Sequence, residues 1–106
     1  MLEDALIDDA AHRFALLGDP TRLRILRALM AQGEMSVGAA AVAAKTSRFN
    51  ASAHLNRLAR GGLVTRRQVG TTRYYQVADA GLGTVCDWVC ESVRARASLL
   101  AAAGPG

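Results

Sequence analysis

The feature that most constrains the fold is a change in the spacing of apolar residues at the glycine pair Gly61-Gly62. Before this pair, large apolar side chains recur three and four residues apart, which is the spacing of amphipathic helices. After it, LVTRRQV and TRYYQV are rich in β-branched and aromatic residues and are joined around Gly70-Thr71, which predicts a β-hairpin. From Asp79 the helical spacing returns. The sequence therefore predicts a helical protein with one hairpin ahead of its last helix.

Two helices are predicted over the first third of the chain. The first ends at Gly18, and its apolar side chains recur at helical spacing: Leu2, Leu6, Ile7, Phe14 and Leu17. The second begins with Asp19 as its N-cap and Pro20 in its first turn, and it stops at Gly33. The predicted buried stripe of this second helix consists of Leu23, Leu26, Leu29 and Met30.

Two more helices precede the hairpin, and a long one follows it. Ser36 is positioned to cap a short alanine-rich helix that runs to about Ala44, and Ser47 is positioned to cap the next helix. The inward stripe of that fourth helix is Ala51, Leu55 and Leu58. The last helix runs from Asp79 to about Ala102, with a stripe of Leu82, Cys86, Val89 and Val93. The predicted fold is mainly α with a small hairpin, in which two short helices ahead of a basic hairpin describe a helix-turn-helix with a wing.

The size and composition of the chain predict one domain with a thin core. Its 106 residues suffice for a single domain over residues 1–106 but not for two independent cores. Hydrophobic residues make up 51% of the chain, but many are alanines, and the aromatic residues are only two Phe, two Tyr and one Trp. Alanine favours helix and buries little area. We therefore expect a partner subunit to complete the core.

Several classes of protein are disfavoured. No run approaches the roughly 20 apolar residues of a membrane span, and the acidic start MLEDALIDD lacks the basic region of a secretory signal. Two cysteines four residues apart do not form the disulfide framework of a secreted domain, so we expect a cytoplasmic protein with no membrane partner. The chain is not predicted to be an enzyme, because no phosphate-binding glycine loop or paired carboxylates are visible and neither His12 nor His54 has an evident acidic partner.

The charges are distributed very unevenly along the chain. From Lys45 through Arg73 there are seven Lys or Arg residues and no Asp or Glu, whereas four of the first nine residues are acidic. On charge alone, a solvated basic face explains this block as well as a polyanionic partner does. A merely solvated face does not explain why acids are missing from both the fourth helix and the hairpin. We therefore expect this block to bind double-stranded DNA.

The fourth helix has the side chains of a recognition helix. If its apolar stripe faces the core, Arg48, Phe49, Ser52, Ala53 and Asn56 point outward. Arg and Asn can contact guanine or adenine edges in bidentate fashion, and small side chains let the backbone enter the major groove. Phe49 has two interpretations, contact with a thymine methyl or packing against the preceding helix. The predicted DNA-contacting residues are Ser47, Arg48, Phe49, Asn50, Ser52, His54, Asn56, Arg57, Arg66, Arg67, Thr71 and Arg73. The arginines near the helix end and on the hairpin, including Arg60, are expected to neutralise phosphates.

Three segments together resemble the ArsR/SmtB family of bacterial winged-helix repressors: ALLGDPTRLRILRAL, SRFNASAHL and GGLVTRRQVGTTRYYQV. The resemblance covers about Phe14 to Asp79. It implies a winged helix-turn-helix of order α-α-α-α-β-β-α, dimeric through helices within 1–17 and 79–103. It also implies repression at a near-palindromic operator, with release by an inducer and no cofactor required for DNA binding.

The chain departs from the metal sensors that it resembles. Ser36-Val37-Gly38 stands where their third-helix site has Cys-Val-Cys. In their last-helix zinc site only Asp79 matches, because Gly81, Ser92 and Ala95 occupy the positions of the other ligands. Neither family site is therefore expected to bind a metal in this chain.

Cys86 and Cys90 are the remaining candidates for a sensor. Their i, i+4 spacing places both thiols on one helical face, where they could chelate a soft metal or a trivalent arsenical or antimonial. Arsenite prefers a third thiol, which the dimer mate could supply, and His12 is a weaker candidate ligand. A redox role is a second possibility, although a disulfide within one helical turn is strained. The alternatives are inert cysteines packed in a dimer interface, in a repressor that senses no metal or in a protein-interaction adaptor.

Overall fold

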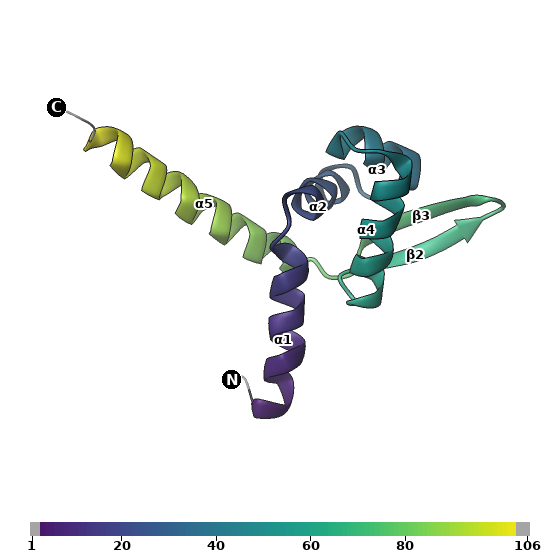
Figure 1. Ribbon diagram of the computed structural model, residues 1–106, viewed down its shortest axis with the longest axis horizontal. Helices are drawn as coiled ribbons and strands as arrows, with labels where there is room; N and C mark the ends of the chain where they lie inside the picture. The colour runs from purple at the N-terminus through teal and green to yellow at the C-terminus, as the bar shows by residue number, and fades with distance from the viewer. Residues whose placement is uncertain (1–2, 104–106) are drawn as a thin grey trace.

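The computed structural model describes residues 3–103, and its elements follow the predicted order with one short strand added (Figure 1). They are α1 (Asp4–Leu17), α2 (Pro20–Gln32), β1 (Met35–Ser36), α3 (Val37–Ala44), α4 (Arg48–Arg60), β2 (Val64–Val69), β3 (Thr72–Val77) and α5 (Gly81–Ala102). Residues 1–2 and 104–106 of the predicted domain lie outside the described residues. They include Leu2 of the predicted first stripe. Within residues 3–103, every helix is too short or too polar to span a lipid bilayer.

The predicted helix caps are confirmed. The Asp19 carboxylate accepts the backbone N–H of Arg22 at 3.0 Å, and this hydrogen bond is the main cause of the lowered pKa of Asp19. The hydroxyls of Ser36 and Ser47 each accept a backbone N–H three residues on, at 3.1 and 3.0 Å. These bonds satisfy amide groups that a helix start leaves unpaired, so polar side chains fix where α2, α3 and α4 begin.

The hairpin is correctly predicted, but the sheet has a third strand. β2 and β3 pair antiparallel from Val64–Val77 to Val69–Thr72, around a turn in which Gly70 has φ +59°. β1 adds to the other edge of β3, with Met35 opposite Tyr75, so the strand order is β1-β3-β2. A two-residue strand is too short to show alternation, which is why the sequence did not reveal it.

The core lies between α2, α3, α4 and the base of the hairpin. The predicted stripe of α4 is confirmed, because Ala51, Leu55 and Leu58 have no exposed surface. The six largest fully buried side chains are Ile25, Leu26, Leu29, Leu55, Leu58 and Tyr75. Tyr75 brings the centre of β3 into this core, so the hairpin is fixed against α4 at its base.

The predicted stripe of α2 is partly wrong. Leu26 and Leu29 are buried as expected, but Leu23 and Met30 are 43% and 37% exposed, and Ile25 is buried in their place. At about 100° per residue, Leu23 and Met30 lie roughly a quarter-turn away from the face that packs on α3 and α4. The apolar side chains of α2 therefore cover a wider part of the helix surface than the part that is buried.

Helices α1 and α5 project away from this body in different directions (Figure 1). The radius of gyration is 16.1 Å, whereas a compact chain of this length has about 13 Å. Leu82 is buried in the first turn of α5, but every described side chain after Cys86 is exposed, including Val89 and Val93 of the predicted stripe. Phe14 on α1 is 63% exposed. One chain therefore leaves the apolar faces of both helices uncovered.

Candidate nucleic-acid interface

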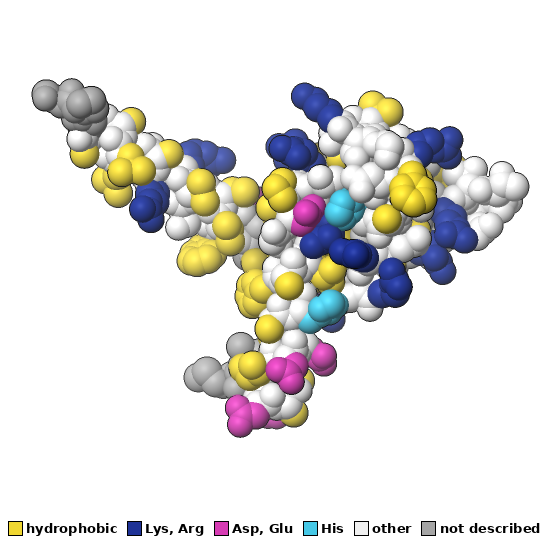
Figure 2. Space-filling model, viewed as in Figure 1, with side chains coloured by type: hydrophobic (Ala, Val, Ile, Leu, Met, Phe, Trp, Pro, Cys, Tyr) yellow, Lys and Arg dark blue, Asp and Glu magenta, His cyan; other side chains and the backbone are white. Residues whose placement is uncertain are grey.

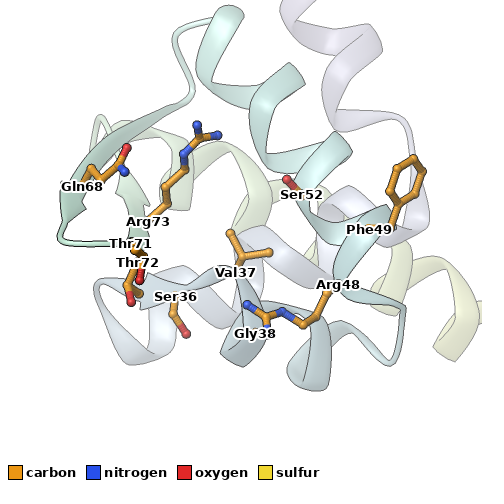
Figure 3. A pocket seen from close by; sticks show the side chains of 10 residues that line it. All are labelled: Ser36, Val37, Gly38, Arg48, Phe49, Ser52, Gln68, Thr71, Thr72 and Arg73. Carbon is orange, nitrogen blue, oxygen red and sulfur yellow. The ribbon is translucent and has the colours of Figure 1, made fainter.

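A groove of about 860 Å³ runs between the start of α3, the first half of α4 and the tip of the hairpin (Figure 3). Its lining residues are Ser36, Val37, Gly38, Arg48, Phe49, Ser52, Gln68, Thr71, Thr72 and Arg73. Five of these are predicted contacts, and they come from two segments, α4 and the hairpin. None of the lining residues is acidic. The fold thus gathers part of the basic block around one concave surface.

The start of α3 also lines this groove, and the sequence did not indicate that. The chain reverses between α3 and α4 at Lys45, a residue with φ +55°, so the two helices pack side by side. A Cβ atom added to Gly38 would lie 3.8 Å from Nε of Arg48, and Figure 3 shows the guanidinium of Arg48 reaching toward Gly38. The only signal that could have indicated this approach is a glycine within the first turn of a helix.

Phe49 is 87% exposed, which excludes packing against the preceding helix. Its ring points away from Val37 and Ser52 in Figure 3. Ser52 is half-buried beside Val37, and Ala53 is exposed. The first two turns of α4 therefore present one long cation, one aromatic ring and two small residues.

Three predicted contacts of α4 also have hydrogen-bond partners inside the protein. Asn50 donates through Nδ2 to the Thr46 hydroxyl at 2.7 Å. Nδ1 of His54 lies 3.2 Å from Nη1 of Arg22. Oδ1 of Asn56 accepts the Tyr75 hydroxyl at 2.8 Å. All three residues are half-buried, because each lies where α4 borders a neighbouring segment: the α3–α4 turn, α2 or the hairpin.

Arg22 explains the position of His54. Its Nε donates to the Leu16 carbonyl at 2.7 Å and its Nη2 to the Ala15 carbonyl at 3.4 Å. The same guanidinium thus connects the end of α1 with the middle of α4. His54 is half-buried and belongs to this connection rather than to the outer face of α4.

The two faces of the hairpin carry different arginines. Arg66 pairs with Tyr75 and Gln68 with Arg73 across the strands, and directly opposed residues share a face. Because Tyr75 packs on α4, Arg66 and Arg73 lie on the α4 side. Arg67 pairs with Tyr74 and lies on the other side.

The Arg67 side chain is held by an acid from another part of the chain. Its Nε lies 3.0 Å from Oε2 of Glu34, and its guanidinium lies 5.4 Å from the centre of the Tyr74 ring. The hydrogen bond between the two side chains lowers the pKa of Glu34 and raises that of Arg67. The prediction of an acid-free surface therefore needs a correction, since β1 brings Glu34 to the hairpin and neutralises one predicted contact.

The remaining predicted contacts are exposed. Arg57 and Arg60 lie in the last turn of α4, Thr71 lies at the hairpin tip, and Ser47 is exposed while it caps α4. Figure 2 shows Lys and Arg side chains over the α4 and hairpin end of the molecule and acidic side chains gathered on α1. The separation of charge along the sequence is thus also a separation in space.

The two cysteines lie one turn apart on α5. Cys86 is half-buried, Cys90 is exposed, and both are free thiols. Burial, together with the neighbouring Cys90 and Asp87, raises the pKa of Cys86. Residues 3–103 hold no cluster of three His, Cys, Asp or Glu side chains that could bind a metal.

Comparison with known proteins places the chain among transcriptional regulators. A helix-turn-helix domain model matches residues 17–67. The HTH-type transcriptional regulator Rv0324 of Mycobacterium tuberculosis is 45% identical over 74 residues, which are 70% of this chain and 32% of that protein. The regulator MJ1325 of Methanocaldococcus jannaschii is 39% identical over 72 residues, 68% of this chain and 81% of that protein. The chain thus spans about a third of the first relative and most of the second. These relatives confirm the prediction of a helix-turn-helix transcriptional regulator.

Solved structures agree with this assignment. The winged helix-turn-helix domain of Mb0332 from Mycobacterium bovis, described as homodimeric and as a possible ArsR-family regulator, is 36% identical. It superposes with a TM-score of 0.75 over 89% of each chain. The antimony-specific repressor AntR gives a TM-score of 0.77 at 26% identity, over 91% of this chain and 87% of that one. The chain belongs to the ArsR/SmtB family of winged helix-turn-helix transcriptional regulators.

Proposed function

We propose that this chain acts in the cytoplasm as a homodimeric repressor that binds a specific operator and leaves it when an inducer binds. The observation that carries this proposal is the groove between α3, α4 and the hairpin, which is lined by Arg48 and Arg73 and by no acidic residue. A DNA duplex has a high density of phosphate charge along its backbone and presents base edges in its grooves. Cations can neutralise the phosphates, and short polar side chains can approach the base edges.

The outer face of α4 would enter the major groove of the operator. Ser52 and Ala53 are small enough to admit the helix, Arg48 has the donors for a guanine edge, and the exposed Phe49 suits a thymine methyl. The guanidinium groups of Arg57 and Arg73, and the Thr71 hydroxyl, would contact the backbone. Backbone contacts set the register of the helix, and base contacts set its sequence preference.

A dimer would present this surface twice. The apolar side chains left exposed on α1 and α5 support dimerisation through these helices, over 1–17 and 79–103, and Mb0332 of the same family is homodimeric. A two-fold dimer should bind two half-sites about one helical turn, ~34 Å, apart. The operator is therefore expected to be near-palindromic.

Arg48→Ala tests the assignment of base contacts. We expect it to cost about 1–3 kcal/mol of binding free energy at one base position in each half-site and to relax the preference there, because a bidentate guanine contact is lost. Arg73→Ala should weaken binding to all sequences alike. Arg24→Ala, which removes an exposed arginine of α2, should change neither the affinity nor the base preference. Binding of operator variants in a gel-shift series measures all three. A uniform loss from Arg48→Ala would make Arg48 a phosphate contact.

The inducer we propose is a thiophilic metalloid or metal held by Cys86 and Cys90. Two thiols on one face of α5 support this, as does the antimony specificity of the similar AntR. The third thiol that a trivalent metalloid prefers would come from the partner chain, since α5 is the proposed interface. An oxidative signal is the second form of this proposal, because both thiols are free.

Titration of the reduced, operator-bound dimer with arsenite, antimonite, Zn(II) and Cd(II) tests this inducer. We expect a trivalent metalloid to release the DNA and to change the fluorescence of Trp88, which lies between the two cysteines. The double variant Cys86→Ser, Cys90→Ser should stay bound. If no reagent or oxidant releases the DNA and the double variant regulates normally, the cysteines are inert. Burial raises the pKa of Cys86, which lowers the share of the reactive thiolate and so favours that alternative.

A further inference from the structure

A second groove, of about 790 Å³, lies between the last turns of α4 and strand β2. Its lining residues are Asn56, Ala59, Arg60, Val64, Thr65 and Arg66. Two of them are cations, two are neutral polar residues, two are small or β-branched apolar residues, and none is an acid. This groove therefore has the charge of an anion site, and it lies at the base of the hairpin, whereas the first groove lies at its tip.

The polar groups of this groove are organised by Tyr75. Its ring is fully buried, and its position opposite Arg66 in the β2–β3 ladder fixes that arginine on the α4 side. The Tyr75 hydroxyl donates to Oδ1 of Asn56 at 2.8 Å, and Nη1 of Arg66 lies 3.5 Å from the same oxygen. Because a guanidinium has only donors, the Asn56 atom that faces it must be the carbonyl oxygen. The amide orientation is therefore fixed by two donors from the hairpin.

This orientation leaves Asn56 with only its NH2 group free for a ligand. Among residues 3–103, Nδ2 of Asn56 makes no hydrogen bond, and no buried side-chain nitrogen or oxygen lacks a partner, so Nδ2 reaches solvent. Bidentate contact with adenine requires both the carbonyl and the amino group of an Asn. Asn56 therefore cannot make the adenine contact expected of an outward asparagine on a recognition helix.

We propose that this groove seats one backbone phosphate of the operator, and that Tyr75 is the positioning residue that orients Asn56 and Arg66 toward it. Asn56 Nδ2 and the guanidinium groups of Arg60 and Arg66 are all donors, which suits the oxygens of a phosphodiester. Among base edges in the major groove, only the O6 and N7 acceptors of guanine would suit such a set of donors, and the measurement of base preference separates the two. This inference rests on the proposed DNA binding and assigns Asn56 to the backbone instead of the bases.

The test uses the full chain and operator duplexes in which one phosphate at a time is replaced by a neutral methylphosphonate. Wild-type protein is compared with Tyr75→Phe, which removes only the hydroxyl, and with Asn56→Ala. Tyr74→Phe is the matched control, because Tyr74 is the neighbouring tyrosine on the other face of the hairpin. Base preference is measured in parallel with a library of operator variants.

We expect Tyr75→Phe and Asn56→Ala each to weaken binding about two- to tenfold for every sequence, as for the loss of one hydrogen bond, with base preference unchanged. Wild type should lose affinity at each contacted phosphate, and at one of these positions in each half-site both variants should lose markedly less. Tyr74→Phe should behave as wild type. A merely structural role of Tyr75 would weaken binding without changing the response to one particular phosphate.

Two results would overturn the phosphate site: a changed base preference in Asn56→Ala, or variants as sensitive as wild type at every phosphate. If Tyr75→Phe lowers the melting temperature so far that it does not fold, Asn56→Ala alone decides between these outcomes. A wild-type protein that binds no duplex in dilute buffer contradicts the proposed function itself. Binding without the phosphate-specific response contradicts only this inference.

Discussion

Val93→Asp is expected to convert the protein to a monomer and to reduce operator affinity with it. Val93 is 64% exposed in a single chain, on the face of α5 that begins with the buried Leu82. If this face is the dimer interface, the variant buries an unpaired carboxylate, at a cost of several kcal/mol. Two-fold symmetry applies the cost twice. We expect the dimer dissociation constant to rise about a thousandfold or more.

Sedimentation velocity at micromolar concentration measures this change, with Ser98→Asp as the matched control. Ser98 is exposed on α5 and lies roughly opposite Val93 around the helix, so its carboxylate would remain in solvent. The control should sediment as a dimer and bind the operator normally. If Val93→Asp remains dimeric, this face of α5 is not the dimer interface.

Operator affinity is expected to fall about a thousandfold between 50 and 200 mM salt. In each protomer Arg57 and Arg73 would each contact one phosphate, and Arg60 and Arg66 would share another. This gives roughly six contacted phosphates per dimer, which release enough counterions for such a loss. Arg67 is left out of this count, because Glu34 already neutralises it.

Fluorescence anisotropy with a labelled operator gives the slope of log K against log salt. Arg73→Gln removes one cation from each half of the dimer, so its slope should be shallower by about 2. A wild-type slope near zero would mean that the basic surface is merely solvated. A slope that Arg73→Gln leaves unchanged would remove the hairpin from the backbone contacts.

Local features of the chain could be predicted because local physics decides them. Asp19, Ser36 and Ser47 cap helices through hydrogen bonds that span three residues, so the sequence around each cap contains both partners. The stripe of Ala51 and Leu55 is likewise a property of one helix. These signals placed α1 to α5 and the hairpin in the correct order.

Features that join distant segments could not be predicted in this way. Glu34 and Arg67 are 33 residues apart, and nothing in the sequence near either one indicates that β1 adds to β3. A helical wheel placed Asn56 on the outward face of α4 and His54 on its flank, but it could not show their bonds to Tyr75 and Arg22. Those bonds depend on how α4 packs against the hairpin and α2, which only the folded chain shows.

The most direct measurement is the stoichiometry of the purified protein on a duplex from its own promoter, by native mass spectrometry or sedimentation in dilute buffer. The account predicts two chains on one near-palindromic duplex, at concentrations where an unrelated duplex of equal length stays free. Free duplex at every protein concentration, or a single chain on the DNA, would contradict the claim that α4 and the hairpin of two protomers form one DNA-binding surface.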